Sequence, residues 1–195
     1  MYGSQNKINI VLAIYSDSRY VFRLEDIAMI VGETDFLSIN KKLNYYVHSG
    51  KLLNPRRGIY AKPGLTQEEL ASKIYTPSYI SLEYVLQLAG VIFQYDSRLT
   101  SVSYLSRELE INDKIFSYRK IKGEVLVNNR GVEQKGNINI ATPERAFLDI
   151  MYLNTTYFFD NPKVLDKKEI SRLLPIYNSK TLNLRVLKLL KDGGD

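Results

Sequence analysis

Basic side chains gather in one stretch of this 195-residue chain. Residues 36–64 hold six lysines and arginines and no acid, so they match the formal charge of +6 of the whole chain. The six are Lys41, Lys42, Lys51, Arg56, Arg57 and Lys62. Clustered cations bind polyanions, because each charge that reaches a phosphate releases a condensed counterion. The type and clustering of these residues therefore predict contact with nucleic acid.

The first half of this stretch predicts a helix that carries part of the charge. Ile39, Leu43 and Val47 recur every four residues, which places them on one apolar helical face with Tyr46 beside them. Gly50 follows as a helix stop. The side opposite the apolar face holds Lys41, Asn44, Tyr45 and His48.

The second half of the stretch predicts a β-hairpin. Residues 51–53 and 59–61 read as two short strands around a turn at 54–58. In this turn Pro55 presets φ and Gly58 accepts a positive φ. A helix with a cationic outer face, followed by a hairpin with two arginines at its tip, is how a winged helix meets DNA. The helix fits the major groove, and the wing reaches phosphates or the minor groove.

Eight residues of this stretch are candidates for the DNA contact. They are Ser38, Asn40, Lys41, Lys42, Asn44, Tyr45, Arg56 and Arg57. Asparagine suits adenine and lysine suits guanine or phosphate, and the sequence leaves base-edge and phosphate roles open. The two arginines are expected on phosphate or in the minor groove. The alternatives are a solvated basic helix beside a structural hairpin, or a winged helix that binds a protein.

The second half of the chain offers two weaker chemical patterns. Glu133 and Lys135, with Asp113 upstream, have the E-x-K form of a metal-dependent nuclease. Such a site needs two acids on adjacent strands around Mg²⁺, and here the pair falls where a turn is expected, at 131–136. Further on, Arg145 and Asp149 lie four residues apart on an expected helix, and we interpret them as a structural ion pair.

The composition excludes several classes of site. The chain has no cysteine, which rules out disulfides and cysteine-ligated metals, and its one histidine, His48, argues against a transition-metal site. Neither a P-loop nor a G-x-G-x-x-G motif is present, so we expect no metal, no cofactor and no enzyme. No apolar run reaches about 18 residues and the first residues are polar, so a cytoplasmic protein without a membrane span is expected.

The order of elements predicts an α+β protein with two domains. Residues 1–64 are expected to form a winged helix-turn-helix domain, with helices at 7–16 and 24–31 before the third helix and the hairpin. Residues 65–195 are expected to form a mixed α/β domain with an antiparallel-type sheet.

Local signals place the elements within each domain. In the first domain, Ile8, Val11, Leu12 and Tyr15 are expected to form the inward face of the first helix. Gly32 is expected to end the second helix, and Thr34 or Asp35 to cap the third. In the second domain, helices are expected at 66–74, at 82–89 with Ser81 as cap, from Thr142 onward, at 167–174 and at 180–191. Strands are expected at 99–105, 115–121, 124–128 and 137–141.

Three segments resemble the AbiEi-type antitoxins of type IV toxin–antitoxin systems. The first is the hairpin at 50–60. The second is SYISLEYVLQLAGVI at 78–92, which resembles the "yiS…aL…hGli" segment of that family. The third is IATPERAFLD at 140–149, which resembles its "a…pERallD" helix. Tyr84 and Val85 depart from the small "SAL" triad that is usual there, so different packing around that helix is expected.

The resemblance implies a function in two parts. It implies an N-terminal winged helix that binds double-stranded operator DNA and represses the antitoxin–toxin operon, with self-association on the DNA. It also implies a C-terminal domain that counters a nucleotidyltransferase-like toxin, and direct contact with that toxin stays open. Two other hypotheses remain: a module that binds a toxin or an enzyme without DNA, and the small nuclease.

Overall fold

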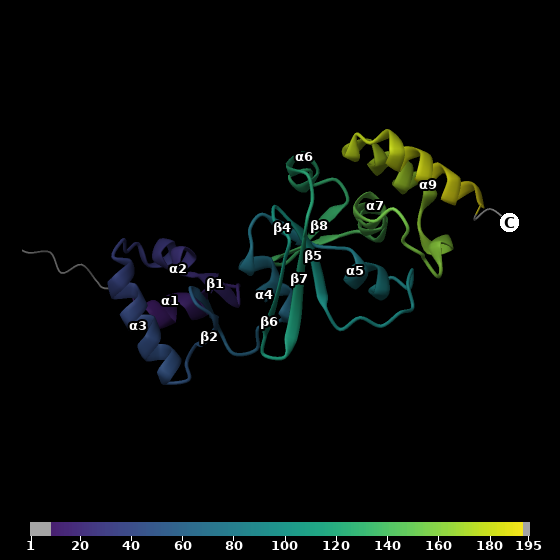
Figure 1. Ribbon diagram of the computed structural model, residues 1–195. Coiled ribbons are helices and arrows are strands. Elements are labelled where there is room, and N and C mark those ends of the chain that lie inside the picture. Colours follow the sequence, from purple (N-terminus) through teal and green to yellow (C-terminus); the bar gives the residue numbers. More distant parts are fainter. Residues whose placement is uncertain (1–8, 193–195) are drawn as a thin grey trace, which may run out of the picture. The chain divides into compact units, whose positions relative to one another are not determined.

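The computed structural model describes residues 9–192, with side chains through Leu189. The protein is α+β, with helices packed on one three-stranded and one six-stranded sheet (Figure 1). The chain forms two compact units, which divide between Ile74 and Tyr75.

The first unit contains four helices and a small antiparallel sheet among its described residues. In chain order these are α1 (Ile10–Ser16), β1 (Val21–Arg23), α2 (Leu24–Val31), α3 (Phe36–His48), β2 (Leu53–Arg56), β3 (Ile59–Ala61) and α4 (Gln67–Ile74). The strand order is β1-β3-β2, and both pairings are antiparallel. The extended piece expected before the second helix is thus the edge strand of a sheet.

The core of the first unit joins the helices to the sheet. Its buried members are Ile10, Ile14, Phe22, Ile27, Ala28, Ile39, Leu43, Leu52 and Tyr60. The expected apolar face of α3 is confirmed, since Ile39 and Leu43 are fully buried. The expected face of the first helix is confirmed only at Val11, which packs against this core. Leu12 and Tyr15 are 64% and 48% exposed, and Ile10 and Ile14 are the residues that are buried. Ile8 lies outside the described residues.

Helix ends in this unit follow their local signals. The Asp35 carboxylate accepts from the backbone N–H groups of Leu37 and Ser38, at 3.0 and 3.1 Å, and so caps α3. Gly32 ends α2 in the left-handed conformation with φ of 64°. Both signals act within one turn of helix, which is why the sequence alone located them.

The hairpin is shifted relative to its predicted position. The first strand runs over Leu53–Arg56 instead of 51–53, and the turn narrows to Arg57 and Gly58, whose φ is +78°. The Asn54 amide donates to the backbone carbonyls of Arg56 and Ile59, at 2.9 and 2.7 Å. These hydrogen bonds close the turn and move Arg56 from the expected tip into a strand.

The boundary of the first unit falls beyond Gly64, where the sequence suggested a domain edge. Helix α4 packs on β1, because the buried Glu69 carboxylate accepts from the backbone N–H groups of Tyr20 and Val21, at 2.7 and 3.3 Å. The Arg23 guanidinium donates to the carbonyl of Lys73 at 2.8 Å. These contacts join residues about 50 positions apart, so no local pattern predicts them.

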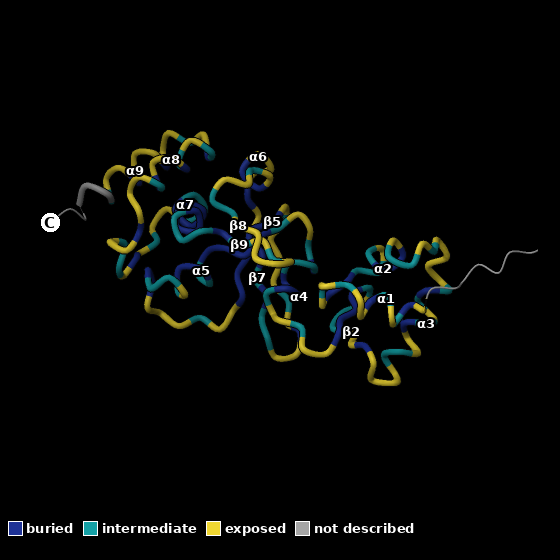
Figure 2. The backbone as a smooth tube through the Cα atoms, turned by 180° about the vertical axis from the view of Figure 1, so that it is seen from behind, coloured by how far each residue is buried: buried dark blue, intermediate teal, exposed yellow. Residues whose placement is uncertain are grey.

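The second unit is built on a six-stranded sheet. Its elements are β4 (Ser78–Ile80), α5 (Glu83–Leu88), β5 (Leu99–Ser103), β6 (Arg107–Ile111), β7 (Lys114–Lys120), α6 (Gly123–Leu126), β8 (Val132–Lys135), β9 (Ile138–Ala141), α7 (Pro143–Leu153), α8 (Lys167–Leu173) and α9 (Lys180–Asp192), with 3-10 turns at Pro162–Val164 and Leu174–Tyr177. Helices α5, α7, α8 and α9 lie on one side of the strands, and buried residues concentrate along the sheet and α7 (Figures 1 and 2).

The sheet is mixed instead of antiparallel. Its strand order is β6-β7-β5-β4-β9-β8, and the pairs β4 with β9 and β5 with β7 are parallel. Strands β5, β7 and β9 correspond to expected ones, whereas β4, β6 and β8 were not expected. Each of these three gains its hydrogen bonds from a partner strand, and a three-residue strand such as β4 has too little periodicity to predict.

Two predictions in the second unit are wrong for the same reason. The segment at 124–128 is not a strand, since Gly123–Leu126 forms the short helix α6. Ser81 does not cap α5, because its hydroxyl donates to the Asp149 carboxylate at 2.7 Å. In both segments a side chain of α7 forms a hydrogen bond. Asp149 accepts from the Ser81 hydroxyl, and Arg145 donates to the Val125 carbonyl at 2.7 Å.

The predicted ion pair between Arg145 and Asp149 is confirmed. Their side chains are both fully buried and 3.4 Å apart. Tyr79, Ser81 and Tyr177 also donate their hydroxyls to Asp149 at 2.7–3.2 Å. Burial raises the pKa of the Asp149 carboxyl, while Arg145 and the three hydroxyls act to lower it. The cluster is therefore a hydrogen-bonded structural centre of the unit.

Candidate nucleic-acid interface

Helix α3 presents a polar surface opposite its buried face. Lys41, Asn44 and Tyr45 are exposed, and the last two follow Lys41 by three and four residues, so they lie on the same side of the helix as Lys41. Tyr45 is 67% exposed and its ring meets Tyr46 edge to face, with centroids 5.4 Å apart. These three predicted residues are brought together in a position from which a ligand could be reached.

Asn40 contacts the protein itself. Its side-chain carbonyl oxygen accepts a hydrogen bond from the Tyr60 hydroxyl on β3. The half-buried asparagine thus joins α3 to the sheet, and its oxygen is engaged within the fold. This role is structural and differs from the adenine contact that its residue type suggested.

Lys42 and Ser38 face an acid that lies before α3. The Lys42 ammonium is 2.8 Å from the Glu33 carboxylate. This ion pair and the Ser38 hydroxyl lower the pKa of Glu33. Lys42 is therefore partly neutralised, and it contributes less to the surface potential than its sequence position suggested.

The two arginines of the hairpin differ in their surroundings. Arg57 is exposed in the turn, whereas Arg56 is half-buried in β2, where it pairs with Ile59 of β3. Arg57 thus occupies the tip expected for both. A guanidinium in such a turn can form two parallel hydrogen bonds to a phosphate.

Lys62 does not belong to the surface at all. Its side chain is buried, and its ammonium donates to the carbonyl of Asp17. The ammonium also lies 5.2–5.8 Å from the ring centroids of Tyr15, Tyr20 and Phe22. One of the six cations in the basic stretch is thus buried and bonded within the protein, which its position in the sequence did not reveal.

Two further residues belong to the surface that the sequence selected. Leu37 is 76% exposed and precedes Lys41 by one helical turn, so it continues the same side of α3. Lys51 is exposed, and its ammonium lies 5.9 Å from the centroid of the Tyr46 ring. The four-residue spacing from Lys41 could have identified Leu37. We call Leu37, Lys41, Asn44, Tyr45, Lys51 and Arg57 the cationic surface.

Two acids of the first unit, Asp17 and Asp26, form ion pairs with nearby cations. Asp17 is 2.7 Å from Arg19, and Asp26 is 3.3 Å from Lys73. The hydrogen bonds from Arg19 lower the pKa of Asp17 to about 2. These carboxylates, which lie near β1 and α4, are held in local ion pairs.

The residues of the nuclease hypothesis are far apart. Asp113 lies in the turn between β6 and β7, whereas Glu133 and Lys135 lie on β8 at the other edge of the sheet. With strands about 4.8 Å apart, the four to five steps across the sheet separate them by roughly 20 Å. Within residues 9–192, no group of three histidine, cysteine or acidic residues could hold a metal ion.

Two broader observations complete the description of the chain. Among the described helices, none has the length and apolar character needed to cross a bilayer. No protein-family model and no curated protein matches the sequence.

Proposed function

We propose that this protein is a DNA-binding antitoxin of a type IV toxin–antitoxin pair, with an N-terminal winged helix that represses its own operon. The observation that carries the DNA-binding part is the cationic surface itself. Helix α3 buries Ile39 and Leu43 and turns an acid-free side to solvent, next to a hairpin whose turn exposes Arg57. The antitoxin part, which opposes a nucleotidyltransferase-like toxin, is supported by the resemblance of residues 78–92 and 140–149.

In the proposed complex α3 lies in the major groove of operator DNA. Its 13 residues give a length of about 20 Å, enough to follow the groove across several base pairs. Asn44 suits the edge of adenine, Lys41 suits guanine or phosphate, and Leu37 suits a thymine methyl group. These three side chains stand on one side of the helix, as base readout requires.

The hairpin acts as the wing in this arrangement. Arg57 reaches phosphate or the minor groove, and Lys51 adds a second charge beside α3. Only a few phosphates are contacted by one copy, so we propose that two copies bind neighbouring half-sites and gain affinity together.

A gel-shift titration with the DNA upstream of the gene, at several salt concentrations, tests the proposal. The double variant Arg56→Ala, Arg57→Ala should bind more weakly, and its salt slope should fall by roughly one, since Arg57 supplies a phosphate contact and each lost contact removes about 0.9. A matched control is Lys120→Ala, Lys122→Ala, which removes two exposed charges from the second unit. Equal affinity and slope for the wild type and the arginine variant would refute the DNA-binding role.

The antitoxin part needs a separate measurement. Co-expression with the neighbouring gene product should rescue growth, and the arginine variant should keep this rescue when both genes are driven from a foreign promoter. Loss of rescue with intact folding would show that the cationic surface serves toxin control directly.

A further inference from the structure

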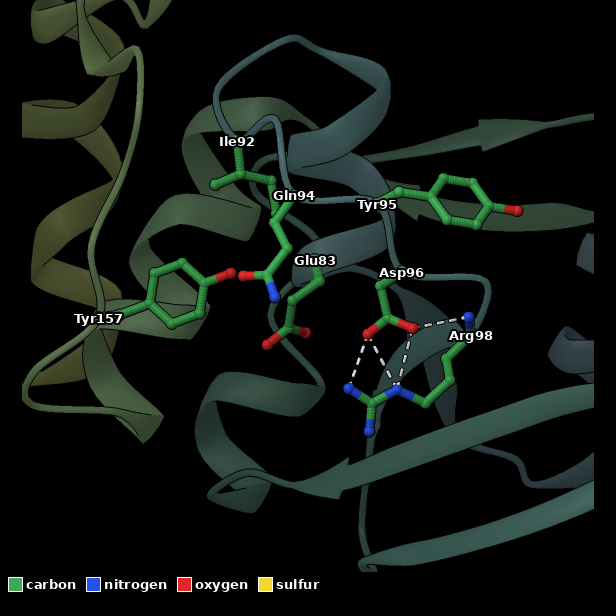
Figure 3. Close-up of a pocket in the computed structure, with 7 residues that line it drawn as sticks. All are labelled: Glu83, Ile92, Gln94, Tyr95, Asp96, Arg98 and Tyr157. Atoms are coloured by element: carbon green, nitrogen blue, oxygen red, sulfur yellow. Dashed lines mark hydrogen bonds and ion pairs between the residues drawn. The ribbon is translucent and has the colours of Figure 1, made fainter.

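The second unit contains a pocket of about 400 Å³ that the proposed DNA binding does not use. It is lined by Glu83, Ile92, Gln94, Tyr95, Asp96, Arg98 and Tyr157. In Figure 3 the Tyr157 hydroxyl, the Gln94 amide and the Glu83 carboxylate turn toward one another, whereas the Tyr95 ring points away. The pocket thus combines a carboxylate, an amide and an aromatic ring at one place.

Two loops that build the pocket are held together by hydrogen bonds. The backbone N–H of Asn161 donates to the carbonyl of Val91 at 2.9 Å, and that of Phe93 donates to the Asp160 carboxylate at 2.8 Å. These contacts join the loop after α5 to the loop after α7. The walls are therefore positioned before any ligand arrives, which lowers the entropic cost of binding.

The side chains that line the pocket include two carboxylates, Glu83 and Asp96, and one guanidinium, Arg98. Asp96 is neutralised by Arg98, which approaches it at 2.7 Å. Glu83 has a longer ion pair, 3.4 Å, with Arg119, and the Asp160 carboxylate lies close by on the Phe93 backbone. Glu108 also lies 3.6 Å from Arg98, so four carboxylates lie near three cations, Arg98, Arg119 and Lys114, the last of which acts to lower the pKa of Asp96.

The nearby carboxylates affect the pKa of the Tyr157 hydroxyl. Burial, together with the carboxylates of Glu83, Asp160 and Asp96, raises its pKa to about 12, while Arg119 acts to lower it. The three carboxylates that disfavour a phenolate at this position favour a cation there. A cation that lies over the Tyr157 ring would also gain a cation–π contact.

Large apolar side chains are exposed around the pocket. Phe93, 70% exposed, lies between lining residues Ile92 and Gln94, and Phe158, 77% exposed, follows Tyr157. Tyr95, itself a lining residue, is 82% exposed. A site for a small solute has no need of an apolar rim, whereas protein interfaces surround an anchoring side chain with such residues.

We propose that this pocket receives an arginine side chain from a partner protein, whose apolar residues cover Phe93, Tyr95 and Phe158. The guanidinium would bind the Glu83 carboxylate and the Gln94 amide oxygen and stack on the Tyr157 ring. Arginine is favoured over lysine because its planar group can form these contacts together. An anionic ligand such as DNA is disfavoured by the same carboxylates.

An NMR titration of the full chain tests the proposal with three probes. They are a blocked leucine–arginine–phenylalanine tripeptide, the same tripeptide with citrulline for arginine, and arginine amide. The arginine tripeptide should cause saturable shifts of the backbone amides of Glu83, Asp96 and Tyr157. The citrulline peptide, which lacks the charge, should bind roughly tenfold or more weakly.

Variants separate the pocket from its rim. Glu83→Gln should lower the affinity for the arginine tripeptide until it is close to the affinity for the citrulline peptide. Phe93→Ser, at an exposed position that leaves the fold unchanged, should remove the advantage of the tripeptide over arginine amide.

Three results would overturn the proposal. Equal affinities for the arginine and citrulline peptides would show that the positive charge of arginine does not contribute to binding. Absence of saturable shifts at these amides would show that the tripeptide does not bind in the pocket. Equal affinity of arginine amide and the tripeptide would make the site one for a small cation instead of a protein. None of these residues belongs to the cationic surface, so failure here leaves the DNA-binding proposal standing.

Discussion

Arg145 in the second unit and Arg57 in the first show two opposite uses of the same side chain. Arg145 is fully buried, and its donors reach the Asp149 carboxylate, the Tyr79 hydroxyl and the carbonyls of Val125, Asn128 and Arg130. These five hydrogen bonds use all five N–H groups of a guanidinium. Arg57 stands exposed in a turn. A guanidinium serves a ligand only where its own chain leaves its donors in water.

The lysines of the basic stretch repeat this comparison within a single unit. Lys62 is enclosed by three aromatic rings and a carbonyl, whereas Lys41 is exposed on α3. Both count equally in the formal charge. The difference lies in desolvation, because a buried ammonium has replaced its water by partners and has nothing left to offer a phosphate.

The largest effect is expected at the buried pair. Asp149→Ala should lower the free energy of unfolding of the second unit by about 3–5 kcal/mol, because it leaves Arg145 buried without its carboxylate. Chemical denaturation followed by tyrosine fluorescence would measure it. The control Glu169→Ala removes an exposed ion pair to Arg172 and should leave the transition unchanged. A comparable loss in both variants would contradict the contrast between buried and exposed arginines.

A smaller loss is expected at Gly131, beside Arg145. Its φ is +72°, and an added Cβ would lie 2.8 Å from a Leu173 methyl and 3.0 Å from the Arg145 Cβ. Gly131→Ala should therefore cost about 2–3 kcal/mol through strain and overpacking.

Gly136 is the matched control for that substitution. It has a φ of +60° and no atom within 4 Å of the added Cβ, so Gly136→Ala should cost only about 1 kcal/mol. Thermal unfolding of both variants measures the difference. If the two substitutions cost the same, close packing against Arg145 and Leu173 is not what makes Gly131 necessary.

Lys62 and Lys41 should separate stability from binding. Lys62→Met should lower the stability of the first unit by about 1–2 kcal/mol, since the Asp17 carbonyl loses a charged donor. Its folded form should retain DNA affinity. Lys41→Ala should leave stability unchanged and weaken DNA binding by about 1–3 kcal/mol if it contacts a base. Denaturation and gel shifts on both variants measure these changes. If Lys41→Ala lowered stability and Lys62→Met lowered DNA affinity, the roles assigned to the two lysines would be wrong.

The smallest effect concerns acid. The pKa of Asp17 falls from 3.8 to about 2 through its hydrogen bonds with Arg19, so its contribution is present above pH 4 and is lost as the pH falls toward 2. The residue is partly exposed, so we expect about 1 kcal/mol after allowing for solvent screening. Asp17→Asn should abolish this part of the pH dependence between 4 and 2, as measured by denaturation of the first unit. An unchanged acid profile would contradict it.

How much the sequence could predict follows from the distance between interacting groups. Asp35 as the cap of α3 and the pairing of Arg145 with Asp149 act within a helical turn or two, so residue type and spacing were sufficient. The exposed set of Lys41, Asn44 and Tyr45 followed from helical periodicity in the same way. The shifted hairpin was missed because Asn54 closes its turn with hydrogen bonds that only the folded strands align.

By itself, then, the sequence determined an α+β protein, most of its helices, the basic stretch and the nature of the ion pair in α7. Only the tertiary structure decided that β4 lies parallel to β9, that Lys62 is enclosed and that Asn40 faces Tyr60. It also decided that Glu83 and Tyr157 line one pocket. These features join residues 20 to 74 positions apart, and their free energy comes from excluding water between surfaces that no local pattern specifies.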